Sequence, residues 1–161
     1  MQSYAACLEK FTGKKLSEIP GTGAAGGLGF AFLWGLPNVE LKPGIDIVLE
    51  AVGLTNELKD ADVVVTGEGC LDFQTAMGKV PVGVAKTAKN YNCKVIAFAG
   101  SVTEEAKKCN EKGIDAFFSI LPGVCSLDEA MDTEIAQKNM RNAAEQVFRL
   151  ILTLLKEKCY E

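Results

Sequence analysis

Polar side chains gather in one short stretch of the sequence, residues 66–79. The stretch holds two carboxylates, one amide, two hydroxyls and one ammonium group, on Glu68, Asp72, Gln74, Thr66, Thr75 and Lys79. Gly67 and Gly69 lie among them, and glycine lets a ligand approach the backbone closely. Such a density of polar groups is typical of a ligand site. It also fits a solvated loop in which Asp72 caps a helix, and spacing alone does not separate the two.

The neighbouring elements place this stretch where α/β proteins bind ligands. Residues 63–65 are predicted to form a short apolar strand that leads directly into the polar residues. In open α/β sheets, ligands bind outside the carboxyl ends of the strands. A second apolar strand, residues 95–99, leads into residues 100–103, where Ser101 and Thr103 suit either an anion or a helix cap. Both strand ends are therefore candidate ligand positions.

The pattern after residue 60 predicts the α/β fold class. Apolar strand segments occur at residues 63–65, 95–99 and 116–121, with helical segments at 81–90 and 103–113 between them. This β-α-β-α-β order is typical of a parallel sheet with helices on both faces. A last apolar periodicity over residues 127–156 predicts a long helix that packs along the core.

The chain is long enough for one domain, or for one domain and part of another, because it has 161 residues. Residues 1–60 contain helical patterns and five glycines between Pro20 and Gly29. We predict that residues 1–60 are a helical, glycine-rich segment belonging to a second domain or to a cleft wall. Residues 61–161 are predicted to be the α/β domain.

The glycine-rich segment matches a dinucleotide-binding fingerprint only by its letters. Gly21, Gly23 and Gly26 have the G-x-G-x-x-G spacing, but residues 14–20 do not form the apolar strand that the fingerprint requires. A glycine-rich turn that lets a helix pack closely explains the same residues. A third alternative is an anion site, because backbone N–H groups at the start of a helix attract phosphate or carboxylate.

Composition excludes several classes of function. The chain has no histidine, which excludes a Ser-His or Cys-His catalytic pair and a Cys/His zinc site. Cys70 is therefore predicted to be a packing thiol rather than a nucleophile. A net charge of −4, without a cluster of basic residues, disfavours binding to nucleic acid.

The cysteines and apolar segments bear on where the protein works. Six cysteines are spaced without a C-x-x-C pair, and the N-terminus does not resemble a secretion signal. We predict reduced, mostly buried thiols in a cytoplasmic protein. No apolar run is long enough to span a bilayer, so we expect no insertion into a membrane.

Several separate blocks of this sequence resemble the bacterial glycerate kinase family. The blocks lie in the order and spacing of that family, at residues 20–29, 43–45, 49–51, 62–69, 71–72, 74–75, 78–79, 81–85 and 99–102. The resemblance is specific from about Pro20 to Val102 and weaker beyond. It implies two α/β domains facing a cleft, and transfer of the γ-phosphoryl group of ATP to a hydroxyl of D-glycerate with Mg²⁺.

The resemblance also implies which residues line the cleft. These are Gly67, Glu68, Gly69, Asp72, Gln74 and Thr75, with the loop containing Gly23, Gly26 and Gly27 helping to shape it. Phosphoryl transfer needs charge neutralisation and a carboxylate on the attacking hydroxyl or on the metal. We therefore predict that Asp72 acts as the base or a Mg²⁺ contact, and that Glu68 contacts the metal or a substrate hydroxyl. Lys79 is assigned to a phosphate or to the glycerate carboxylate.

Two departures from the family pattern qualify what the resemblance implies. Position 70 is cysteine where the family usually has arginine, which removes one cationic contact to an anionic substrate. Family members are also longer, so the chain resembles their C-terminal portion, and we predict that it does not phosphorylate glycerate alone. An alternative is a non-catalytic α/β module that retains a small anion-binding site. The apolar area that the absent portion would cover is expected to favour a homodimer.

Overall fold

The computed structural model describes residues 2–13 and 15–158, and the chain divides into two compact units between Ala51 and Val52. This division lies earlier than the boundary after residue 60 drawn from the sequence. The reason is packing, because Leu58 is buried in the core of the second unit and Leu54 packs against that core. Whether the first unit belongs to a second domain or to a cleft wall stays a prediction.

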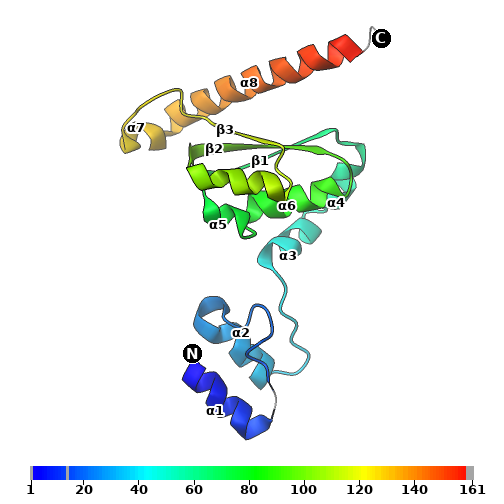
Figure 1. The fold of residues 1–161 in the computed structure, drawn as a ribbon, viewed down its shortest axis with the longest axis vertical. Helices are drawn as coiled ribbons and strands as arrows, with labels where there is room; N and C mark the ends of the chain where they lie inside the picture. The colour runs from blue at the N-terminus through cyan, green and yellow to red at the C-terminus, as the bar shows by residue number, and fades with distance from the viewer. Residues whose placement is uncertain (1, 14, 159–161) are drawn as a thin grey trace. The chain divides into compact units, whose positions relative to one another are not determined.

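The first unit is helical, as its sequence predicts (Figure 1). Its helices are α1 (Gln2–Thr12), α2 (Ala24–Gly35) and α3 (Gly44–Ala51). The chain is not regularly helical at the start of α2, because Ala25, Gly26 and Gly27 all have positive φ. A Cβ on Gly29 would lie 2.6 Å from the carbonyl oxygen of Gly21, so only glycine allows this close contact between turn and helix.

The second unit contains a three-stranded parallel sheet in the order β1-β2-β3. Its strands are β1 (Val63–Leu71), β2 (Lys94–Val102) and β3 (Ala116–Ser119). The connections contain α5 (Phe73–Ala76) and α6 (Val80–Lys89) after β1, and the 3₁₀ helix η2 (Glu104–Lys112) after β2. The predicted α/β class and the β-α-β-α-β order are confirmed.

The helices lie on both faces of the sheet (Figure 1), and β2 separates two clusters of buried side chains. Val95, Ala97 and Ala99 point to the face covered by α6 and η2. Ile96 and Phe98 point to the opposite face, where Val147 of α8 (Thr133–Lys158) packs. This alternation follows from the two-residue period of a strand, and both faces of β2 are buried as expected for the centre of a parallel sheet.

The structure corrects three strand boundaries and one helix type predicted from the sequence. Strand β1 continues through residues 66–71, although Gly67 and Gly69 predict a loop there. β2 likewise extends to Val102, whereas β3 ends at Ser119 instead of residue 121. The helix predicted at 103–113 is a 3₁₀ helix, and Thr103 makes no side-chain cap bond to it.

The long C-terminal helix predicted over residues 127–156 is interrupted at Asp132. A short helix, α7 (Leu127–Met131), precedes the break, and α8 begins at Thr133. The Asp132 backbone is extended, and its side chain accepts a hydrogen bond of 2.9 Å from the N–H of Ile135. Asp132 therefore caps a new helix instead of continuing the previous one. None of the helices in residues 2–13 and 15–158 is long and apolar enough to cross a membrane.

The cysteines only partly match the prediction of buried thiols. Cys93 and Cys109 are buried, but Cys7 and Cys125 are exposed and Cys70 is half-buried. All five are free thiols, in line with the predicted reduced state. Cys159 lies outside the described residues.

Candidate functional site

A buried threonine joins the two carboxylates that the sequence selected. Thr75 lies in α5 and is fully buried, and its hydroxyl donates a hydrogen bond to Oε1 of Glu68. The same hydroxyl accepts a hydrogen bond of 3.2 Å from the backbone N–H of Asp72 and lies 3.2 Å from Oδ1 of Asp72. Glu68 and Asp72, four positions apart in sequence, are thereby held at one point.

The local fold explains why these residues meet. Glu68 pairs with Ala99 in the sheet and belongs to the last part of β1, and α5 begins immediately after the strand ends. Asp72 is the N-cap of α5, and its Oδ1 accepts a hydrogen bond of 2.9 Å from the N–H of Thr75. Asp72 and Thr75 cap each other reciprocally in this turn. The helix-capping explanation of Asp72 is therefore correct, and it coexists with a position beside Glu68.

Lys79 supplies a positive charge next to this pair. Its Nζ lies 3.7 Å from Oδ1 of Asp72, with the lysine side chain 42% exposed and the aspartate side chain 24% exposed. An ion pair of this exposure contributes little to stability because water screens it. The ammonium group can consequently exchange Asp72 for an anionic ligand at small cost.

The pKa of Asp72 is held below its usual value. The hydrogen bond from the Thr75 N–H contributes most, desolvation acts against it, and the positive charge of Lys79 adds to the lowering. Asp72 is therefore fully ionised at neutral pH. Close by, burial raises the pKa of the Cys109 thiol, and the negative charges of Glu68 and Asp72 raise it further. Cys109 is thus an inert thiol in this environment.

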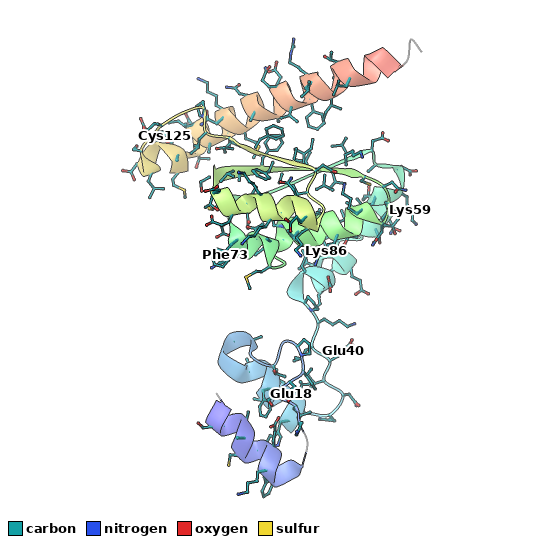
Figure 2. The ribbon with its side chains drawn as sticks, viewed as in Figure 1. Glu18, Glu40, Lys59, Phe73, Lys86 and Cys125 are labelled. Atoms are coloured by element: carbon teal, nitrogen blue, oxygen red, sulfur yellow. The ribbon has the colours of Figure 1, made fainter. Side chains whose placement is uncertain are left out.

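A cavity of about 630 Å³ opens at the carboxyl ends of β1 and β2, and we call it the strand-end cavity. Its lining residues come from both strands, from the segment after β3 and from α7 and α8: Gly67, Glu68, Gly69, Phe98, Ala99, Gly100, Ser101, Ile120, Leu121, Cys125, Ser126, Leu127, Ala130, Met131 and Met140. Figure 2 shows Cys125 where the chain enters α7, on the face of the sheet opposite Phe73 of α5. The position agrees with the rule that ligands bind outside the carboxyl ends of parallel strands.

The predicted site residues are distributed unevenly around this cavity. Gly67, Glu68 and Gly69 line it, but the Glu68 carboxylate points to Thr75 of α5, on the other face of the sheet. Asp72 does not line the cavity and is bonded to Thr75 and Lys79. Thr75 is buried behind Glu68, so its hydroxyl is used within the protein. Gln74 is exposed in the first turn of α5.

The predicted site glycines of the first unit lie at the start of α2. Gly23 precedes α2, and Gly26 and Gly27 form its left-handed start, with Gly27 buried. The residues before them form turns rather than a strand, so the dinucleotide fingerprint lacks the element it requires. The role of these glycines in a ligand site stays a prediction.

At two positions near the cavity, close backbone contacts require glycine. A Cβ on Gly67 would lie 2.3 Å from the carbonyl oxygen of Phe98, and one on Gly100 would lie 2.8 Å from that of Gly69. At Gly69 a Cβ would meet nothing within 4 Å. Of the two predicted site glycines in β1, Gly69 is therefore the one whose side-chain position is open space.

Sequence reasoning missed the contribution of the segment after β3. Cys125 and Ser126 line the strand-end cavity, and Ser126 caps α7 by accepting a hydrogen bond of 3.2 Å from the N–H of Glu129. The Ser-x-x-Glu pattern at 126–129 is a capping signal in the sequence. It marks the start of a helix close to the carboxyl end of the third strand. From this signal the sequence could have predicted that residues 125–126 contribute to the wall of the strand-end cavity.

Comparison with known proteins identifies the family. The model of the glycerate kinase family matches residues 1–152. This chain belongs to the glycerate kinase family. A glycerate kinase from Bacillus subtilis is 44% identical over 146 residues, and a glycerate 2-kinase from Escherichia coli is 44% identical over 130 residues. These alignments cover 89% and 81% of this chain.

The structural comparison agrees. A crystal structure assigned as glycerate kinase 2, from Salmonella typhimurium LT2, has a TM-score of 0.65 and 38% sequence identity over 94% of this chain. The chain spans 38% and 34% of the length of the Bacillus and Escherichia glycerate kinases, and 37% of the Salmonella chain. The resemblance seen in the sequence is thus confirmed, and the match is to a part of the longer family members.

Proposed function

We propose that this chain supplies the carboxylate-bearing part of a site at which ATP phosphorylates a hydroxyl of D-glycerate. One observation carries the proposal: the Glu68 and Asp72 carboxylates meet at the Thr75 hydroxyl beside the carboxyl ends of parallel strands. Membership of the glycerate kinase family supports the reaction class. In this reaction the glycerate oxygen forms a bond to the γ-phosphorus, the bond from that phosphorus to ADP breaks, and the hydroxyl proton leaves to a base.

The geometry separates the roles proposed for the two carboxylates. A general base works best with a pKa near the working pH, and the pKa of Asp72 is instead lowered. Asp72 is therefore better suited to hold Mg²⁺ or to orient Lys79 than to accept the proton. The Glu68 carboxylate is bonded to Thr75 on the face of the sheet that α5 covers, and beside Asp72 it can reach the metal or a substrate hydroxyl.

The donor set fits Mg²⁺. This ion is usually held by one or two carboxylates, with water and substrate phosphates completing its octahedron. Glu68 and Asp72 provide such a pair, and the described residues contain no group of three or more side chains that would form a complete metal cage. Bound Mg²⁺ would neutralise charge on the transferring phosphoryl group. Lys79, once released from Asp72, would contact a phosphate or the glycerate carboxylate.

Substitution in a longer family member tests these roles. In a full-length family member that has aspartate at the position aligned with Asp72, replacing that aspartate by asparagine should abolish most turnover and leave the circular dichroism spectrum unchanged. The matched control replaces the residue aligned with Glu104, which caps no helix and lines no cavity described above, by glutamine. Unchanged kinetics in the Asp72 position would contradict the proposed role.

We also propose that the 161-residue chain has no turnover on its own, since it spans little more than a third of its relatives. Mixed with ATP, Mg²⁺ and D-glycerate it should release no ADP above background, while the full-length Bacillus subtilis relative does so under the same conditions. Robust turnover would contradict this. Cytoplasmic location and a homodimer stay predictions, and sedimentation of the purified chain checks the second.

The alternative of a non-catalytic module with an anion site has one observation in its favour. The charges of Asp72 and Lys79 already neutralise each other in this structure, which leaves less net charge for a catalytic site. Calorimetric titration separates the two proposals: heat with ATP or D-glycerate supports the kinase site, and heat with inorganic phosphate alone supports the module.

A further inference from the structure

Strand β1 lies at an edge of the sheet, and this edge pairs with no other strand in the part of the chain that the structure describes. On its inner side, the C=O of Asp62 accepts a hydrogen bond from the N–H of Lys94 in β2. Alternate residues of a parallel strand bond to the same neighbour, so Val63, Val65 and Gly67 direct their backbone N–H and C=O groups away from β2. A nine-residue strand with an unpaired edge is a template for a further strand.

The usual protections of an edge strand are missing from β1. Natural edges are commonly blocked by lysine or proline, or they are kept very short. Residues 63–71 contain no lysine, arginine or proline. Their one charged side chain, Glu68, is bonded to Thr75 of α5 and therefore does not guard the open edge. Strand β3, at the opposite edge, has only four residues. Of the two edges, β1 is the one suited to take a further strand.

The face of the sheet on which α8 packs is open above β1. Val65 is 48% exposed in the middle of the strand. The strand-end cavity lies on the same face, between Gly67 of the strand and Met131 and Met140 of α7 and α8. On the other face, Val64 packs into the buried cluster that α6 and η2 cover. Strands of a parallel sheet are normally covered on both faces, so β1 lacks a helix on this one.

The handedness of parallel connections explains why that helix is absent. Crossovers between parallel strands are right-handed in nearly all proteins. The connections from β1 to β2 and from β2 to β3 run in the same direction across the sheet, so α6 and η2 lie on one face. A connecting helix above β1 on the opposite face requires strands that continue beyond β1 and wind in the opposite direction, as in doubly wound sheets. The open edge and the open cavity therefore have one cause, a missing strand and its helix.

We propose that β1 binds a separate polypeptide equivalent to the portion of the longer glycerate kinases that this chain does not contain. This partner adds a parallel strand to the β1 edge and seats a helix in the strand-end cavity. The alignment covers 38% of the Bacillus subtilis relative, so more than half of that protein lies outside it, which is ample for a strand and a helix. The binding does not rest on the proposed kinase function, whereas the turnover that the assembly should gain does.

A second copy of this chain is the competing occupant of the edge. In a homodimer with two-fold symmetry β1 would pair with the same strand of its partner, and the two strands would be antiparallel. Both strand pairs of this sheet are parallel. A neighbour that continues the parallel sheet has to be a strand of different sequence, which favours a different polypeptide over a second copy.

Amide hydrogen exchange of the full 161-residue chain, followed by NMR, tests the open edge. In the chain alone, the N–H of Val65 should exchange at least about tenfold faster than those of Val64 and Thr66, which bond to β2. Protection of Val65 in the chain alone would overturn the proposal. Protection that grows with the concentration of the chain would assign the edge to a second copy.

Co-expression with the part of the Bacillus subtilis glycerate kinase outside the alignment tests the partner. Native mass spectrometry should find a complex with one copy of each polypeptide, and exchange at Val65 should slow to the rate of Val64. Absence of this complex, or a complex in which Val65 still exchanges rapidly, would overturn the proposal.

Paired variants locate the interface. Val65→Pro removes the outward N–H and should abolish most of the complex, whereas Val65→Ala keeps the N–H and should retain it. Met131→Lys places a charge in the strand-end cavity from a side chain that is 74% exposed, and it should also abolish most of the complex. Val124→Lys places the same charge on an exposed residue that does not line the cavity. Circular dichroism shows that each variant keeps its fold, and equal complex yields for the two lysine variants would overturn the helix seat.

The outcome is separable from the fate of the proposed function. A complex with one copy of each polypeptide that does not phosphorylate D-glycerate with ATP would overturn the proposed function alone. Turnover by the 161-residue chain without any complex would support the kinase function and overturn the assembly proposed here.

Discussion

The hydroxyl of Thr75 connects two negative charges that would otherwise repel each other. It donates to Glu68 and accepts from the N–H of Asp72, and its side chain is fully buried. The resemblance implies that Thr75 lines the cleft of the enzyme. The structure places it behind the carboxylates, where it positions them and has no free face for a ligand.

Thr75→Val should therefore destabilise the protein, although the shape of the side chain hardly changes. Valine has nearly the same volume but leaves the Glu68 carboxylate and the Asp72 N–H without their partner, at a cost of about 1–3 kcal/mol in the free energy of unfolding. Urea denaturation of the chain measures this cost. Thr75→Ser retains the hydroxyl and should recover most of the loss, and equal stability of the valine and threonine proteins would show that the bonds contribute nothing.

Asp72 makes the stability of the chain depend on pH in acid. Its pKa is lower in the folded protein than in the unfolded chain, chiefly because of the Thr75 N–H, so its ionised form favours folding. That contribution is complete above the unfolded pKa and is lost as the pH falls through the lower folded value. The positive charge of Lys79 lowers the pKa of Asp72 further. Asp72 is also close enough to Glu105 for its negative charge to act on the pKa of Glu105 in the upward direction.

Asp72→Asn isolates this contribution because asparagine is also a good helix N-cap. Thermal denaturation between about pH 2 and pH 6 should show the native protein more stable than the variant at the upper end, with the gap closing below about pH 4. A gap of constant size across the range would mean that the charge of Asp72 does not contribute.

The order of the strands and helices can be predicted from the sequence, but the end of β1 cannot. The alternation of apolar strands and helices gives the correct order because burial on both faces of a parallel sheet leaves a strong periodic signal. The end of β1 is misjudged because Gly67 and Gly69 are signals for a loop in sequence. In the folded protein Gly67 is required by the neighbouring strand, a non-local contact to Phe98 that no local pattern contains.

The two glycines of β1 should consequently respond differently to alanine. Gly67→Ala places a methyl group 2.3 Å from the Phe98 carbonyl oxygen, which forces the strands apart and should lower the melting temperature markedly. Gly69→Ala meets no atom within 4 Å and should keep the fold. Differential scanning fluorimetry compares the two, and equal melting temperatures would contradict the strand packing described here.

Site residues that are close in sequence could be predicted, whereas residues brought together by packing could not. Glu68, Asp72 and Lys79 could be selected because they are close in sequence and follow a strand. Met131 and Met140 could not, since they enter the cavity wall only through the packing of α7 and α8 above the sheet. Their sequence pattern is that of any amphipathic helix, and only the fold distinguishes a wall of a cavity from a wall of the core.

At the scale of the whole molecule, both clusters of buried side chains belong to the second unit. Every residue placed in them lies at or after Leu54, on the sheet, on the helices around it and on the loops that join them. The first unit has its own smaller buried set, which includes Phe30 and Leu49. The sheet and its covering helices thus have the apolar contacts needed for independent stability.

Residues 52–161 alone should therefore fold cooperatively. Their urea midpoint should lie close to that of the same unit in the full chain, because deleting residues 1–51 removes none of the side chains in the two clusters. Circular dichroism and the Met131 and Met140 methyl signals follow the comparison. If the shortened protein instead loses its dispersed methyl spectrum, the first unit must stabilise the sheet through contacts outside both clusters, and the division between Ala51 and Val52 would not be a boundary of folding.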